Sequence, residues 1–219
     1  MAAATEGFAG WPASGLDFYS GLEADNSKTY WNENKDVYEA SVLAPMRALL
    51  EELAEEFGEG KIFRPNRDIR FSADKSPYKT AIGATLRTGG YVQFSANGLA
   101  VGAGCHMMAP DQLERYRAAA AEERSGEELV RAIAEVENQG IEVAVRESLK
   151  SAPRGYPKDH PRAELLRNKD LAAWKQWPID GWLHTGGAKT HVVDALHGSR
   201  PLTLWLDAHV GPTTIARTR

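Results

Sequence analysis

Residues Arg64 to Thr80 read RPNRDIRFSADKSPYKT, and the rest of the chain is organised around this stretch. Ile69 and Phe71 alternate with polar neighbours, which predicts a short β-strand over Arg67 to Phe71. Side chains of a strand alternate between its two faces, so the two arginines of this strand would point in opposite directions. If either face is covered, its guanidinium needs an anionic partner, because an unpaired buried charge is very costly.

The stretch gathers hydrogen-bond donors that suit an anion. The planar fork of arginine matches a carboxylate or a phosphate in two places, and lysine and tyrosine add further donors. The first hypothesis is therefore a site for a small anionic ligand, phosphate or carboxylate. The alternative is an internal ion-pair network that fixes the following loop, in a structural or protein-interaction domain. The candidate ligand-binding residues are Arg64, Arg67, Asp68, Arg70, Asp74, Lys75, Tyr78 and Lys79.

The same residues carry a resemblance to a known family. The spacing Arg64-x-x-Arg67-Asp68-x-Arg70-Phe71-x-x-Asp74-Lys75-x-x-Tyr78 resembles the signature of the domain of unknown function 2461 family, a bacterial family of about this chain length. Every position of that motif is present, and the resemblance extends from the Trp31 region to the Trp182 region. It implies a common fold, and it adds no activity, cofactor or partner.

Composition bounds the class of protein. The 219 residues are 42% hydrophobic and 26% charged, which is typical of soluble globular proteins. A net charge of −4 and a pI near 5.9 argue against a general binder of nucleic acid or membrane surfaces. Two segments are nevertheless basic, Lys61 to Lys79 and Lys150 to Lys175. Aromatic residues near them keep weak nucleic-acid binding as a third hypothesis.

Cysteine content and hydropathy indicate a cytoplasmic location. Cys105 is the only cysteine, so the chain forms no internal disulfide, which fits a reducing compartment. No apolar run is long enough to span a membrane, and the first residues lack the features of a secretory signal. We interpret Cys105, in a predicted strand, as a small buried hydrophobic residue.

The periodicity of apolar residues predicts an α+β fold in one domain over residues 1–219. A mostly antiparallel sheet of about five strands, a meander, is flanked by helices. Asn97-Gly98 is the strongest hairpin signal. Ser14 is predicted to cap the first helix, and Ser125 to open a capping box for a later one. The expected parts are a helical N-terminal part 14–57, a β meander 61–108, a helical hairpin 111–140 and a C-terminal α/β part 141–219.

Two further features of the chain leave alternatives open. Gly102 and Gly104 leave one face of a predicted strand bare, which suits either a ligand reached by Arg67 or Arg70, or a helix packed there. Trp31 begins a polar aromatic segment that either lines the site or starts a helix with Trp31 in the core.

A second basic-aromatic segment lies between Pro153 and Pro161. Its prolines favour an extended or turned loop, and loops on a rigid scaffold often carry function. The segment closes over the same site or is a surface connection. Its candidate secondary site residues are Arg154, Tyr156 and His160.

Motifs of established chemistry give no support for a reaction. There is no His-Glu-x-x-His or Cys-x-x-Cys pattern, and His191, Asp194 and His197 do not keep three ligands on one helix face, so we predict no metal site. Neither a phosphate-binding loop nor a dinucleotide fingerprint occurs, so no cofactor is predicted. A serine nucleophile elbow is also missing. Whether the protein is an enzyme stays open, as do its protein partners.

Overall fold

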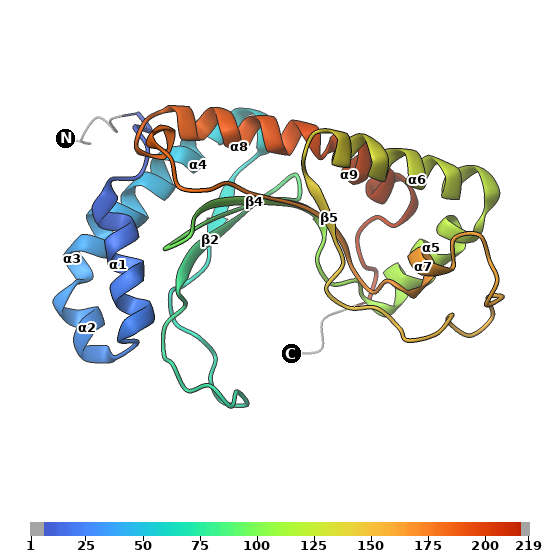
Figure 1. Cartoon of the computed structure of the whole chain (residues 1–219), viewed down its shortest axis with the longest axis horizontal. Coiled ribbons are helices and arrows are strands. Elements are labelled where there is room, and N and C mark those ends of the chain that lie inside the picture. Colours follow the sequence, from blue (N-terminus) through green and yellow to red (C-terminus); the bar gives the residue numbers. More distant parts are fainter. Residues whose placement is uncertain (1–6, 216–219) are drawn as a thin grey trace. The chain divides into compact units, whose positions relative to one another are not determined.

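The computed structural model describes residues 7–215, which divide into two compact units. The first unit comprises residues 7–101 and 176–194, and the second comprises residues 102–175 and 195–215. Figure 1 shows the elements of both in sequence colours. Whether the two units fold as one domain stays a prediction. Among the described residues, no helix is both long and apolar enough to cross a membrane.

The first unit begins with a helical region, as the periodicity predicts. Its first helix starts at Ala13 after Pro12, so the predicted cap at Ser14 is wrong. The Ser14 hydroxyl donates instead to Ser41 Oγ at 2.8 Å, because it already lies inside the first turn. Pro45 lies in the first turn of the last helix of the region, directly after a π-helical turn, so a new helix starts next to this proline. The helices are α1 Ala13–Ala24, α2 Lys28–Glu33, α3 Lys35–Tyr38, the π-helix η1 Glu39–Leu43 and α4 Ala44–Phe57.

The sheet has the strand order β1-β2-β3-β4-β6-β5 and is antiparallel, which confirms the α+β class and the meander. The Asn97-Gly98 hairpin is confirmed, with Gly98 at a φ of +84° between the third and fourth strands. Register follows from pairs such as Lys61 with Thr85. The strands are β1 Gly60–Ile62, β2 Ala81–Leu86, β3 Gly90–Ser95, β4 Gly98–Cys105, β5 Glu142–Ala144 and β6 Leu171–Gln176.

Aromatic side chains fill the core of the first unit. Trp11 is fully buried and stacks on Phe94 of β3 with ring centroids 4.9 Å apart. Gly15 lets α1 pack closely against η1, because a Cβ on Gly15 would lie 2.6 Å from the Ser41 carbonyl oxygen. The Trp11 backbone N–H donates to the Leu183 carbonyl at 3.0 Å and so joins the returning chain to this core. That returning chain forms the 3₁₀ helix η2 Gly181–His184 and enters α8 Gly187–Gly198.

The second unit contains the predicted helical hairpin, but its second helix is capped differently. Glu122 is the N-cap, and its carboxylate accepts hydrogen bonds from the N–H groups of Arg124 and Ser125 at 3.1 and 2.7 Å. Ser125 is buried and donates to the Ala119 carbonyl, so it does not open a capping box. A carboxylate is the better acceptor at the positive end of a helix. The helices are α5 Pro110–Ala121, α6 Glu123–Asn138, α7 Ala163–Arg167 and α9 Arg200–His209.

The two strand glycines of the second unit lie against a neighbouring strand, and a helix also packs at one of them. A Cβ on Gly102 would lie 3.0 Å from the Trp174 ring of β6. Gly104 has a φ of +123°, and a Cβ there would lie 2.7 Å from the Leu171 carbonyl oxygen. The approach of β6 leaves no room for a ligand at either glycine. The alternative of a packed helix is confirmed at Gly104, where a Cβ would lie 3.4 Å from the Leu206 side chain of α9.

Candidate functional site

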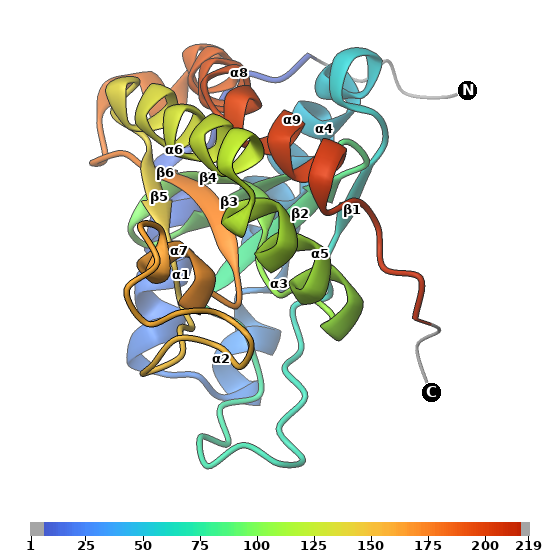
Figure 2. The same ribbon diagram turned by 90° about the vertical axis from the view of Figure 1, so that its right-hand side faces the viewer.

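The stretch Arg64 to Thr80 lies in a long loop that joins β1 to β2, and we call residues 63–80 the arm (Figure 1). Its two legs pair only near the sheet. The Lys79 N–H donates to the Pro65 carbonyl at 2.8 Å, and the Arg67 N–H donates to the Pro77 carbonyl at 2.9 Å. Figure 2 shows both legs extending away from the strands to a common tip. The base of the arm is thus a short continuation of the β1–β2 hairpin.

The predicted strand over Arg67 to Phe71 is wrong, because these residues are irregular. At the tip, side chains compete with cross-strand pairing. Asp74 Oδ1 accepts from the Ser76 N–H at 2.9 Å, and Asp68 Oδ1 accepts from the Arg70 N–H at 3.3 Å. Aspartates that bond the backbone two residues on favour turns over strands. The expectation that Arg67 and Arg70 point to opposite faces of a strand therefore does not hold.

Tyr78 anchors the arm to the helical part of the first unit. The Asn26 side chain holds its backbone on both sides, donating to the Tyr78 carbonyl and accepting from its N–H, each at 3.1 Å. The Tyr78 ring stacks on Trp31 with centroids 4.3 Å apart and planes within 10°. Both rings are more than nine-tenths buried, which confirms Trp31 as a core residue. Tyr78 is placed to fix the loop.

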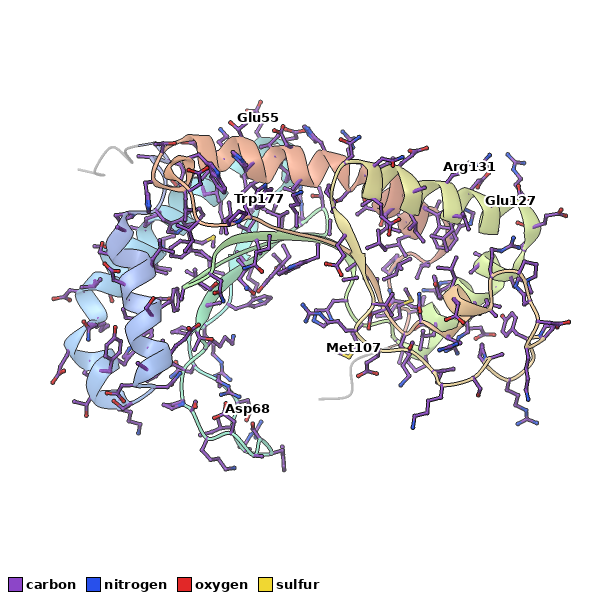
Figure 3. All side chains as sticks on the ribbon, in the orientation of Figure 1. Glu55, Asp68, Met107, Glu127, Arg131 and Trp177 are labelled. Carbon is purple, nitrogen blue, oxygen red and sulfur yellow. The ribbon has the colours of Figure 1, made fainter. Side chains whose placement is uncertain are left out.

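The arginines of the tip have their own acidic partners. Arg70 Nε and Nη2 donate to the two Asp68 carboxylate oxygens at 3.0 and 2.7 Å. Arg67 donates to Asp74. The Arg70 contact lowers the pKa of Asp68 to about 2, and hydrogen bonds from Ser76 and then Arg67 hold the pKa of Asp74 below its usual range. These are separate exposed pairs, and Figure 3 shows Asp68 at the far end of the arm.

The lysines of the stretch bond backbone carbonyls. Lys75 Nζ donates to the Ile69 carbonyl at 3.0 Å, and Lys79 Nζ donates to the Arg64 carbonyl at 2.9 Å. Burial, and then the nearby Arg64 charge, lower the pKa of Lys79. Its ammonium lies 5.4 Å from the centre of the Phe63 ring. Both lysines thus help to fold the arm.

One cavity is lined by the arm and by strands β2 and β3, and we call it the arm cavity. It has a volume of about 650 Å³. Arg67 and Lys79 line it together with Glu23 and Asp74, so its positive and negative charges are equal in number. Both cations already have partners, as described above. This cavity offers an anion no excess of free donors.

A second cavity, the edge cavity, lies along β1 on the first unit and has a volume of about 830 Å³. It is lined by four cations and one carboxylate. Lys35 pairs with Glu39 at 3.7 Å, whereas the other three cations form no ion pair among the described residues. The exposed Arg47 lies close enough to Tyr38 to oppose the burial that raises the pKa of this tyrosine to about 12. The charged lining residues are Lys35, Glu39, Arg47, Lys61 and Arg64.

Eight residues were predicted to bind an anion, and two of them, Arg64 and Tyr78, line the edge cavity. Arg64 is the cation of the two, and it has no ion-pair partner among residues 7–215. Our sequence reasoning missed Arg47 and Lys61. Lys35 belongs to the polar aromatic segment that begins at Trp31, which we expected either to line the site or to start a helix, and both Trp31 and Lys35 line this cavity. Lys35 and Glu39 stand four residues apart and so share a helix face.

The three secondary residues belong to the second unit. Tyr156 packs against its hydrophobic core, and Arg154 is exposed. His160 Nδ1 accepts from the Arg162 N–H at 3.0 Å, and its Nε2 lies 3.3 Å from the Ala121 carbonyl oxygen. The Arg162 guanidinium donates to the carbonyls at the end of α5. These contacts give His160 and Tyr156 a role in holding the loop onto its own unit.

Comparison with known proteins gives one match. A family model described as "Conserved hypothetical protein (DUF2461)" matches residues 14–205, which is most of the chain. Neither the curated proteins nor the solved structures give a match. The matched region includes the arm and every charged residue of the edge cavity.

Proposed function

This chain belongs to the conserved hypothetical protein family DUF2461, whose description names no activity, and we propose from the geometry that it binds a small anionic ligand in the edge cavity. The observation that carries the proposal is the set of cations Arg47, Lys61 and Arg64, which line one cavity and form no ion pair within residues 7–215. A concave, positively charged site concentrates anions and supplies charge-assisted hydrogen bonds.

The size of the cavity suits a small molecule. Ligand sites are clefts of about 300–1,000 Å³, and the edge cavity falls in that range at about 830 Å³. Two arginines supply planar forks, which favour carboxylate and phosphate oxygens over a monovalent halide. The arm cavity supports the proposal less well, because its cations Arg67 and Lys79 are already engaged.

The proposal is tested by titrating citrate, inorganic phosphate and ATP into the protein at low and at physiological salt, with calorimetry as the readout. We expect binding by at least one of them that weakens as salt rises, because ions screen exposed charges over about 8 Å. Arg64→Gln and Arg47→Gln should each weaken binding about fivefold to tenfold, the effect of losing roughly 1 kcal/mol of interaction.

Two control variants separate this site from the rest of the molecule. Arg67→Gln changes an arginine of the arm cavity, and Arg131→Gln changes an exposed arginine on α6 of the second unit (Figure 3). Both should bind as tightly as the unchanged protein. If none of the three anions binds, or if Arg67→Gln removes binding while Arg64→Gln does not, the edge cavity is not the anion site.

A further inference from the structure

The edge cavity runs along the outermost strand of the sheet. β1 stands at one end of the strand order, and its only strand neighbour among the described residues is β2. Seven consecutive residues from Gly60 to Asn66 line the cavity, which at about 3.3 Å per residue is an edge roughly 20 Å long. The opposite wall comes from residues of the helical region, including Lys35 and Arg47. The cavity is thus a groove between a strand edge and helices.

Strand pairing leaves backbone groups directed into this groove. The Phe63 N–H donates to the Gly83 carbonyl at 2.9 Å, and the Arg87 N–H donates to the Glu59 carbonyl at 3.2 Å. Antiparallel pairs alternate between hydrogen-bonded and non-hydrogen-bonded, so alternate residues of β1 direct their backbone groups away from β2. Ile62 pairs with Ala84 at a non-hydrogen-bonded position, and its N–H and C=O therefore face the groove.

The cations select what can pair with this edge. A second copy of the chain would bring the same Lys61 and Arg64 to the groove, so edge-to-edge pairing of two copies is opposed by like charge. An extended segment that carries carboxylates is instead attracted by these cations. Its backbone can complete the hydrogen bonds of Ile62, and alternate side chains can reach Arg47 and Arg64 on the groove walls.

We propose that the edge cavity binds an acidic, extended peptide segment, which adds to β1 as a further strand. The proposal rests on the proposed function and names the ligand class, since the carboxylates of the peptide are the anions. Main-chain hydrogen bonds to the strand edge supply affinity, and the cations supply specificity.

The test uses a blocked, fluorescently labelled hexapeptide of alternating glutamate and valine, with citrate as the small anion. We expect the peptide to bind, and we expect the same peptide N-methylated at every residue to bind at least about tenfold more weakly, because this methylation removes the strand-pairing donors of both peptide edges. The matching peptide of lysine and valine should not bind, because its charges repel those of the groove.

One pair of variants isolates the strand edge. Ile62→Pro removes the outward N–H and none of the hydrogen bonds between β1 and β2, which an edge strand tolerates on its solvent side. It should weaken the peptide at least about tenfold and leave citrate unchanged, whereas Ile62→Val should leave both unchanged. Circular dichroism checks the fold of the proline variant, and the N-methylated peptide tests the same point without a mutation.

The possible outcomes separate the two proposals. If citrate binds and the N-methylated peptide binds as well as the unmodified one, the anion site stands and strand addition is wrong. Equal binding of the lysine peptide overturns the selection by charge. If no peptide binds, strand addition is wrong, and if citrate, inorganic phosphate and ATP also fail to bind, the proposed anion site is wrong as well.

Discussion

At the scale of single residues, most charged groups of this protein serve its fold. Hydrogen bonds that stabilise the charged form lower the pKa of Asp68, Asp74 and Glu122. The largest cause is the Arg70 side chain for Asp68, the Ser76 hydroxyl for Asp74 and the Ser125 N–H for Glu122. Lys75 and Lys79 donate hydrogen bonds to backbone carbonyls. A count of charges therefore overstates the number of groups available to a ligand. Arg47, Lys61 and Arg64 differ from the other cations of the two cavities because they form no ion pair and no side-chain hydrogen bond that fixes the fold among the described residues.

Trp11 gives a prediction at this scale because its indole N–H is buried and has no hydrogen-bond partner in the part of the chain that the structure describes. Trp11→Phe keeps an apolar ring against Phe94 and removes the unsatisfied donor, whose burial costs about 1–3 kcal/mol. We expect this variant to change the free energy of unfolding by about 1 kcal/mol or less. Trp11→Ala leaves a cavity and should cost about 3–5 kcal/mol. Urea denaturation measures both, and equal losses would contradict the account of the orphaned N–H.

At the scale of elements, the parts with simple periodicity were predictable. The Asn97-Gly98 turn and the alternation of β3 gave the hairpins, and the spacing of Leu49 and Leu53 gave α4. These signals are local, since turn chemistry and one buried face decide them. The sheet order that places β6 beside β4 was not predictable, because pairing between distant segments leaves no local trace.

The arm shows why the same reasoning failed at the candidate site. Ile69 and Phe71 have the alternation of a strand, yet Phe71 is 97% exposed and no neighbouring strand reaches it. Alternation predicts a strand only where a sheet is present to bury one face. Without a sheet, the hydrogen bonds that Asp68 and Asp74 accept from the backbone determine the local conformation, which is a turn at each aspartate. The contact of Asn26 with Tyr78, 52 residues away, could not be read from the sequence either.

The arm supplies a prediction about its own anchoring. Asn26→Ala leaves the N–H and C=O of Tyr78 without partners at a buried position and should cost about 1–3 kcal/mol. Arg67→Ala breaks a pair whose carboxylate is exposed, and solvent screening makes such pairs weak, so the melting temperature should barely change. Thermal unfolding of the two variants compares them directly. A larger loss for Arg67→Ala would show that the tip stabilises the fold more than the anchor does.

At the scale of the whole molecule, three regular elements run through both compact units. The boundary between the units falls after Val101 within β4, after Lys175 within β6 and after Asp194 within α8. Continuous hydrogen bonding along a strand and a helix makes it costly to unfold one unit while the other stays intact.

This continuity predicts cooperative unfolding across both units, as a single domain requires. Leu129 is fully buried in the second unit and Leu49 is fully buried in the first, so each change to alanine should cost about 2–5 kcal/mol. Hydrogen exchange followed by mass spectrometry reports protection separately for β2–β3 and for α6. If the protein unfolds as one unit, Leu129→Ala accelerates exchange through global unfolding equally in both regions, and Leu49→Ala does the same. If each variant accelerates exchange only in its own unit, the chain contains two independently unfolding domains, and the prediction of one domain is wrong.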